Sequence, residues 1–363
     1  MLKRNLIKMA GLAAVCAAKI LAGCGGDDIQ DNKPLATKVA EDTAEAIVNQ
    51  LVNAVMESPQ AIEISNLDLA AGEEAPVDFN EVNDLLVIDS QLFAAYDQGL
   101  VIFDLKEKKG TLLDSGEKFN ALTFYDGKLY AGGEGLYFLD EKDLIPAEIE
   151  FSGEVTSLYS EDFRLLIGTS DGLYSQSSFG REQMMENIEV TDLQFDRDGL
   201  WVATNGDGLF RWDGERFHRR FLLRDTTIFN HVRDLDFNRD YLYVAAETGF
   251  FVFDGGKWTQ WTTDDGIPSD CVSAVNADDW MVQVGTSGGM VAYFDKNFYP
   301  AKNLDGVEAN AIRRLDNKIF IGTKQGEVLM KAGEIVTVLI EQAEEQETSP
   351  EVFSQANEEI TAE

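Results

Sequence analysis

A phrase of 36 to 41 residues recurs seven times between Val82 and Ile340. Each copy holds a short apolar run, a few polar residues, an apolar segment that ends in small residues, and a glycine turn. The turn glycines align in every copy: Gly99, Gly135, Gly172, Gly208, Gly249, Gly288 and Gly326. A period of this length with four short strands per copy is typical of the blades of a β-propeller. The sequence therefore predicts an all-β, seven-bladed β-propeller.

The fourth copy shows the strand pattern most clearly. In this copy the apolar pair Val190 and Leu193 precedes the apolar segments 200–204 and 208–212. A fourth, trailing strand is clearest in the fifth copy, at residues 257–261. Small residues at the end of the second segment allow close approach near the crowded axis, and glycine supplies the positive φ that tight turns require. Residues 62–67 are a candidate further strand that helps to close the ring, with no partner identified.

The N-terminus has the pattern of an export signal, with a basic start followed by a short apolar stretch at residues 9–18. This stretch is too short to span a bilayer, which needs about 20 apolar residues. The sequence Leu21-Ala22-Gly23-Cys24 resembles the lipobox of bacterial lipoproteins, and the resemblance implies cleavage before Cys24 and lipidation of its thiol and amino group. Cys16 is the competing candidate, but Val15 before it lacks the small side chain that processing needs.

The expected location follows from this anchor. The chain is predicted to be a lipid-anchored protein of the cell envelope, in the outer membrane and facing the periplasm or the cell surface. The outer membrane is preferred because Gly25 stands where, in some Gram-negative bacteria, an aspartate signals retention in the inner membrane.

The chain divides into five predicted segments. A signal peptide at 1–23 and a flexible tether at 24–34 precede an amphipathic helix at 35–57, the propeller at 60–340 and a disordered acidic tail at 341–363. The helix has two interpretations, because an apolar stripe must be buried somewhere. It either packs as a cap on the propeller or docks another protein.

Charge and cysteine content narrow the classes of partner. The formal net charge is −35, from 65 acidic and 30 basic residues, so nucleic acid and anionic lipid surfaces are repelled. Nucleic acid is therefore excluded as a partner. After processing, Cys271 is the single unmodified cysteine, which rules out an intramolecular disulfide and favours a buried, inert thiol.

Residues that could carry catalysis or hold a cofactor are scarce. Two strings, 168–172 and 285–289, imitate the nucleophile elbow of hydrolases, but both share the register of 322–326 and are interpreted as blade turns. The two histidines, His218 and His231, have no metal-ligand spacing, and no phosphate-cradling glycine loop appears. We therefore expect a non-catalytic protein with no cofactor and no metal.

Two groups of side chains in repeats four to six are candidate binding residues. The first is a set of tryptophans that could stack on sugars or anchor a protein interface: Trp201, Trp212, Trp258 and Trp261. The second is an arginine cluster that could dock a carboxylate or an acidic protein patch: Arg216, Arg219, Arg220 and Arg224. The alternatives are packing between blades for the indoles and ion pairing with acidic neighbours for the arginines.

Repeats four to six resemble the two-component regulator propeller repeat. The resemblance rests on residues 199–209, Gly-Leu-Trp-Val-Ala-Thr-Asn-Gly-Asp-Gly-Leu, and on the linker at 264–272. It implies a periplasmic ligand-sensing propeller, a domain that in this family often stands ahead of a transmembrane segment and a histidine kinase. Neither follows the repeats in this sequence.

Three functions are compatible with a propeller of this composition. The first is a scaffold that docks envelope proteins, which the absence of a catalytic constellation favours. The second is a sensor-like module for a small ligand or glycan, which the family resemblance and the tryptophans favour. The third is a propeller lyase or lactonase, which the scarcity of histidine disfavours.

Overall fold

A computed structural model gives the fold of the repeat region. It describes residues 60–61, 67–68, 81–107, 109–113, 117–161, 163–220, 231–278, 281–301, 304–315 and 318–332. The chain separates into two units, and the unit Ser58–Lys331 contains the repeats. The predicted signal peptide, tether, amphipathic helix and acidic tail lie outside the described residues.

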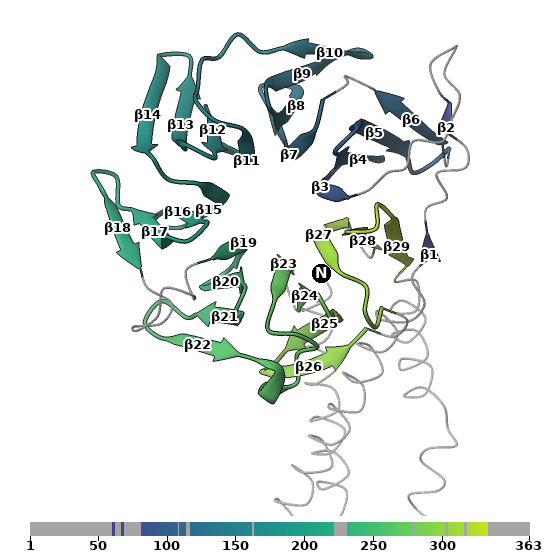
Figure 1. Ribbon diagram of the computed structural model, residues 1–363, viewed down its shortest axis with the longest axis vertical. Coiled ribbons are helices and arrows are strands. Elements are labelled where there is room, and N and C mark those ends of the chain that lie inside the picture. Colours follow the sequence, from purple (N-terminus) through teal and green to yellow (C-terminus); the bar gives the residue numbers. More distant parts are fainter. Residues whose placement is uncertain are drawn as a thin grey trace, which may run out of the picture. The chain divides into compact units, whose positions relative to one another are not determined.

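Seven sheets stand around a common axis, with the first strand of each repeat innermost (Figure 1). The strands of blades 1 and 2 are β3 (Val82–Ile88), β4 (Gln91–Tyr96), β5 (Gly99–Asp104), β6 (Lys109–Leu113), β7 (Phe119–Tyr125), β8 (Lys128–Gly133), β9 (Leu136–Asp140) and β10 (Asp143–Pro146). Those of blades 3 and 4 are β11 (Val155–Glu161), β12 (Arg164–Thr169), β13 (Gly172–Ser177), β14 (Gly180–Glu186), β15 (Val190–Asp196), β16 (Gly199–Thr204), β17 (Gly208–Trp212) and β18 (Phe217–Arg220).

The remaining blades follow the same order. Blades 5 and 6 consist of β19 (Val232–Asn238), β20 (Tyr241–Ala246), β21 (Gly249–Phe253), β22 (Trp258–Trp261), β23 (Val272–Ala277), β24 (Val282–Thr286), β25 (Gly289–Phe294) and β26 (Asn297–Pro300), with the 3-10 turn η3 (Thr263–Asp265) between them. Blade 7 has β27 (Ala309–Leu315), β28 (Lys318–Thr323) and β29 (Val328–Ala332). The predicted seven-bladed all-β fold is confirmed.

The N-terminal segment closes the ring. Strand β1 (Gln60–Ala61) pairs antiparallel with β29 and becomes the outermost strand of blade 7, while β2 (Leu67–Asp68) pairs in parallel with β6 of blade 1. The described strands of this segment are the two short ones at 60–61 and 67–68, and of the extra strand expected at 62–67 all but residue 67 lies outside the described residues. The hydrogen bonds of the two short strands join the start of the repeat region to both its first and its last blade.

The core consists of apolar layers between adjacent blades. Where blades 4 and 5 meet, Trp201 packs with Phe251 and Leu235, and none of the three side chains is more than 4% exposed. The small residues predicted near the axis occupy the tightest of these contacts. A Cβ at Gly322 would lie 2.4 Å from Val82 Cγ1 of the neighbouring blade, so only glycine allows blades 7 and 1 to approach this closely.

The glycine turns lie between the second and third strands of each blade. In blade 6 the turn differs from the sequence alignment by one residue. In blade 6, Gly289 pairs with Thr286 and has φ 131°, whereas Gly288 was expected at this place. Thr286 Oγ1 donates to Gly289 O at 2.7 Å and fixes the turn. In the part of the chain that the structure describes, no helix is long and apolar enough to cross a membrane.

Candidate functional site: the central channel and the outer edge of blade 4

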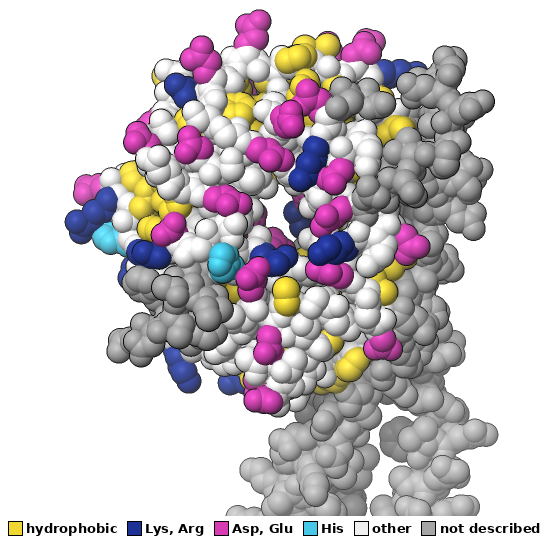
Figure 2. All heavy atoms as spheres, viewed as in Figure 1, with side chains coloured by type: hydrophobic (Ala, Val, Ile, Leu, Met, Phe, Trp, Pro, Cys, Tyr) yellow, Lys and Arg dark blue, Asp and Glu magenta, His cyan; other side chains and the backbone are white. Residues whose placement is uncertain are grey.

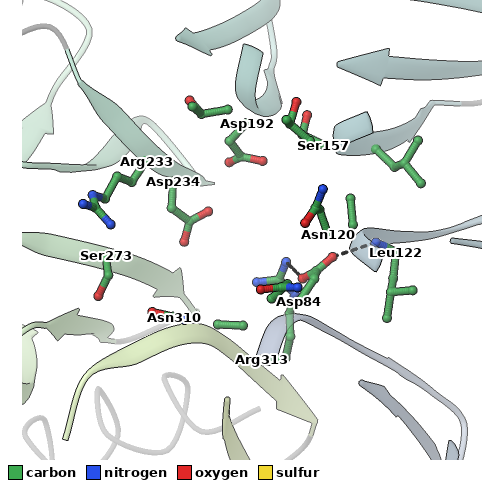
Figure 3. Close-up of a pocket in the computed structure, with 16 residues that line it drawn as sticks. Asp84, Asn120, Leu122, Ser157, Asp192, Arg233, Asp234, Ser273, Asn310 and Arg313 are labelled. Carbon is green, nitrogen blue, oxygen red and sulfur yellow. Dashed lines mark hydrogen bonds and ion pairs between the residues drawn. The ribbon is translucent and has the colours of Figure 1, made fainter. Parts of the chain in front are cut away.

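The seven inner strands surround a polar channel along the axis. Figure 2 shows the hollow at the centre of this face, with acidic and basic side chains around its mouth. Inside lies a cavity of about 110 Å³, with room for several water molecules. Polar side chains from all seven blades line it (Figure 3).

A ring of short polar side chains ties neighbouring blades together at the channel mouth. Each occupies the second position of its inner strand and donates a hydrogen bond of 2.5 to 2.9 Å to the next blade around the ring. The donors are Asn83, Asn120, Thr156, Thr191, Ser273 and Asn310. Six of the seven blade junctions are bridged in this way.

The junction between blades 5 and 6 is different. Arg233 holds the second position of β19 and pairs with Glu247 of its own blade at 2.9 Å. Two aspartates of β19 bridge the junction instead. Asp234 accepts the backbone N–H of Val275, and Asp236 accepts that of Ala277, both at 2.7 Å. At this junction, aspartate side chains therefore take the place of the neutral bridging side chain.

Two further aspartates occupy the position that Asp234 holds in β19. Asp84 accepts the backbone N–H of Leu122 in blade 2, and Asp192 accepts that of Leu235 in blade 5, both at 2.8 Å. Each acceptor lies beside a β-bulge at the start of its inner strand. We call the four side chains that bridge blades in this way the channel carboxyls: Asp84, Asp192, Asp234 and Asp236.

Arg313 of β27 supplies a positive charge to this group. Its Nη2 donates to Asp84 Oδ1 at 2.9 Å, and its side chain is 35% exposed against 14% for Asp84. Burial lowers the pKa of Arg313, but attraction to the channel carboxyls outweighs burial and raises it. The positive charge of Arg313 therefore interacts with all four channel carboxyls.

Burial shifts the channel carboxyls toward their protonated forms. It raises the pKa of Asp84 and Asp234, although Arg313 and backbone N–H donors oppose the shift. It raises the pKa of Asp236 to about 7. For Asp192, burial and the charge of Asp234 together raise the pKa well above its usual range.

The sequence analysis did not identify the channel carboxyls as candidate site residues. A signal was present. Asp84, Asp192 and Asp234 each stand two residues after the first apolar residue of an inner strand. In the propeller register this position faces the axis.

The sequence-predicted tryptophans lie between and along the blades. Trp201 is 1% exposed, its indole Nε1 donates to Asp196 Oδ2 at 2.8 Å, and its ring packs edge-on against Phe253 and Trp258 of blade 5. It is therefore a core residue and offers no surface for a ligand. Trp258 stacks on Phe253 with 4.7 Å between ring centroids.

Two more indoles are partly buried. Trp212 packs on Phe217 at 4.7 Å between centroids, and Trp261 packs edge-on against Phe298 of blade 6. A binding role for Trp212, Trp258 or Trp261 stays a prediction.

The arginines form an exposed group at the outer edge of blade 4. Arg216, Arg219 and Arg220 are exposed on β18 and in the turn before it. Basic side chains gather at this margin (Figure 2). Arg219 contacts Asp207 at 3.4 Å and lies over the ring of Phe210. Arg224 lies outside the described residues.

The other sequence candidates are the two elbow-like strings, the two histidines and Cys271, and each lies in a turn, in a strand or beside one. Residues 170–171 and 287–288 form turns between the second and third strands of their blades, as interpreted. His218 contacts Asp213 at 2.6 Å in the turn before β18, and His231 contacts Asn205 at the channel mouth. Cys271 is partly exposed, so the buried thiol that the sequence predicted is not found. Among the described residues, no three His, Cys, Asp or Glu side chains are arranged to hold a metal.

Comparison with known proteins gives likeness of fold alone. No family model and no curated protein matches the chain. The extracellular domain of a protein described as a hybrid two-component system from B. thetaiotaomicron superposes with a TM-score of 0.59 at 17% identity, over 70% of this chain and 38% of that chain. A second domain of this kind gives 0.57 at 15% identity, over 74% and 41%. This chain thus spans less than half of either.

An enzyme shares the architecture as well. A catalytically inactive variant of virginiamycin B lyase from Staphylococcus aureus superposes with a TM-score of 0.59 at 11% identity, over 70% of this chain and 95% of that chain. Extracellular domains of two-component systems and a lyase therefore share this propeller architecture, and the fold does not indicate a function.

Proposed function

We propose that this protein is a lipid-anchored propeller of the bacterial envelope that acts as a non-catalytic interaction scaffold. The outer edge of blade 4 is its docking surface, and the partner is an envelope protein with an acidic patch. The observation that carries the proposal is the exposed group Arg216, Arg219 and Arg220 in a chain of net charge −35.

The position of this group suits docking. In the described part of its sheet, β18 is the outermost strand and pairs only with β17. Guanidinium groups bind carboxylates through paired hydrogen bonds, so three of them on one edge can select an acidic surface. The rest of the acidic surface repels such a partner and orients it toward this edge.

The test is a crosslinked pull-down of the mature protein from its native envelope. The variant Arg219→Glu/Arg220→Glu reverses two charges at the β18 edge. The control, Arg181→Glu/Arg197→Glu, makes the same charge change at exposed arginines of blades 3 and 4. The proposal requires one enriched protein that is lost in the first variant and kept in the control. Equal loss in both variants, or no enriched protein, would overturn it.

A second function is favoured by the fold neighbours, which include extracellular domains of two-component systems. In this alternative, the protein senses a small ligand or glycan, and the polar cavity in the channel is the place to look for it. A panel of glycans and small molecules, screened by the shift in unfolding temperature, separates the two functions. A ligand that stabilises the purified protein while the pull-down finds no partner would favour the sensor.

A further inference from the structure

Two channel carboxyls from adjacent blades project into the same cavity. Asp192 comes from β15 of blade 4 and Asp234 from β19 of blade 5 (Figure 3). Each also accepts a backbone N–H from the following blade, Leu235 for Asp192 and Val275 for Asp234. The pair therefore connects three blades in series.

Few charges surround the pair to balance it. The titratable and charged groups that face it are Asp84 from β3, Tyr159 from β11, Arg233 and Asp236 from β19, and Arg313 from β27. The inner strands β7 and β23 contribute the neutral side chains Asn120 and Ser273. Arg233 is paired with Glu247, and Arg313 donates to Asp84. Neither basic side chain is hydrogen-bonded to the pair.

We propose that Asp192 and Asp234 share one proton at neutral pH, and that this proton holds blades 4, 5 and 6 together. The backbone N–H of Leu235 donates both to Asp192 Oδ2 at 2.8 Å and to Asp234 Oδ1 at 3.0 Å, so the two carboxyl groups lie close together and cannot both ionise without strong repulsion. With one proton between them, one carboxyl group donates to the other, and both groups keep an oxygen for the backbone N–H of the next blade.

The titration behaviour of the pair agrees with this assignment. Burial, the charge of Asp234 and a hydrogen bond between the two groups raise the pKa of Asp192 well above its usual range. The same hydrogen bond lowers the pKa of Asp234, although burial keeps it raised overall. Both groups therefore keep a raised pKa, and the pair titrates as a unit.

Loss of the proton at higher pH places two negative charges at the junction of blades 4 and 5. Repulsion then pushes β15 and β19 apart and weakens the hydrogen bonds to Leu235 and Val275. Trp201 is buried at this junction against Phe253 and Trp258, and all five tryptophans lie in residues 201–280. Intrinsic tryptophan fluorescence therefore reports on this part of the ring.

The test compares the wild-type protein with Asp192→Asn. The amide introduced by this substitution would donate to Asp234 and accept from Leu235, so it reproduces the protonated state at every pH. Unfolding midpoints are measured by tryptophan fluorescence from about pH 5 to about pH 8.5, in about 0.5 M NaCl to screen surface charges. Asp240→Asn is the control, because Asp240 is an exposed carboxyl of the same blade as Asp234. Asp234→Asn, which reverses the donor, serves if Asp192→Asn does not fold.

The wild-type and control midpoints are expected to fall by about 2 °C per pH unit toward high pH. For Asp192→Asn, the unfolding midpoint is expected to fall less steeply with pH than in the wild type and the control. Infrared spectroscopy at neutral pH should also show the carbonyl stretch of protonated carboxyls in the wild type, and this band should be weaker in Asp192→Asn, where Asp236 still contributes to it. Parallel slopes in all three proteins, or no protonated-carboxyl band in the wild type, would overturn the proposal.

Discussion

Arg313 of the last blade donates a hydrogen bond to Asp84 of the first blade at 2.9 Å, across 229 residues of sequence. The contact lies on the axis, where it joins the two ends of the repeat array. Outside the axis, β1 joins the same two ends by pairing with β29. The ring is thus closed by side-chain contacts near the axis and by backbone hydrogen bonds at its outer edge.

Removing the guanidinium should weaken the whole ring. For Arg313→Met we expect the free energy of unfolding to fall by about 2 kcal/mol, less than for a fully buried pair because the arginine is partly solvated. The free energy lost in Arg313→Met should be greater at pH 8 than at pH 5. At pH 8 more of the channel carboxyls are ionised, and in the variant they have no guanidinium to balance their charge. Urea denaturation at both pH values measures this. Arg197→Met, which breaks an exposed pair with Asp240, should have little effect. Equal effects of the two variants would contradict the role of Arg313.

The contact between Gly322 and Val82 should be intolerant of a methyl group. Gly322→Ala places a Cβ 2.4 Å from Val82 Cγ1 and should cost about 1–3 kcal/mol of unfolding free energy. Adding Val82→Ala should recover part of that loss, giving a coupling of about 1 kcal/mol in a double-mutant cycle. Gly256→Ala is the control, since its nearest neighbour would be 3.8 Å away. Strict additivity would show that the two blades do not meet here.

Trp201 should matter for stability and not for partner binding. Trp201→Phe removes the indole N–H bond to Asp196 and much of the packing against blade 5, at a cost of about 2 kcal/mol. Capture of the partner in the pull-down should be unchanged once the variant is assayed below its unfolding temperature. If Trp201→Phe lost capture of the partner but kept its stability, the prediction would be contradicted, and Trp201 would have to take part in binding.

Asp236 should make the propeller less stable as the pH rises. Burial raises its pKa to about 7, so the folded state holds a proton that the unfolded state releases at much lower pH. Its contribution is therefore complete below about pH 4 and is lost as the pH rises through about 7. Between pH 5 and 8 the loss should be about 2 kcal/mol after allowance for partial solvation. Chemical denaturation of Asp236→Asn should show a flatter pH profile, and an unchanged profile would contradict the shift.

The lipid anchor can be tested independently of the propeller. With Cys24→Ser, the protein should keep its signal peptide, fail to incorporate a labelled fatty acid and fractionate differently from the wild type. Gly25→Asp should shift the protein toward the inner membrane in a Gram-negative host that uses this sorting rule. Labelling of the Cys24→Ser variant would move the lipidation site elsewhere, with Cys16 as the first alternative.

The fold was predictable because its signals are local and repeated. Each blade carries its own apolar strands and glycine turn, so seven copies reinforce one interpretation, and even the shift from Gly288 to Gly289 leaves it intact. Ring closure was less accessible, because the partner of residues 60–61 is a strand about 270 residues away.

The channel was not predicted, because its residues come together only when the ring closes. Asp84 and Arg313 are ordinary charged residues in separate strands, and nothing near either one in sequence indicates the other. The tryptophans show the opposite case, in which a clear sequence pattern did not correspond to a binding surface. Their clustering in repeats four to six suggested a binding surface, yet Trp201 fills the layer between two blades. Composition shows that indoles are concentrated there, while only the packing shows which way each one faces.

Site-specific photocrosslinking in the native envelope tests the central claim most directly. A photoreactive amino acid is placed at Arg216 on the β18 edge, at His231 beside the channel mouth, and at the exposed Asp295 of blade 6 as a control. The scaffold proposal predicts one discrete protein adduct from position 216 and none from the other two. Adducts at position 231 alone, or none at position 216, would contradict it and direct attention to a ligand at the channel.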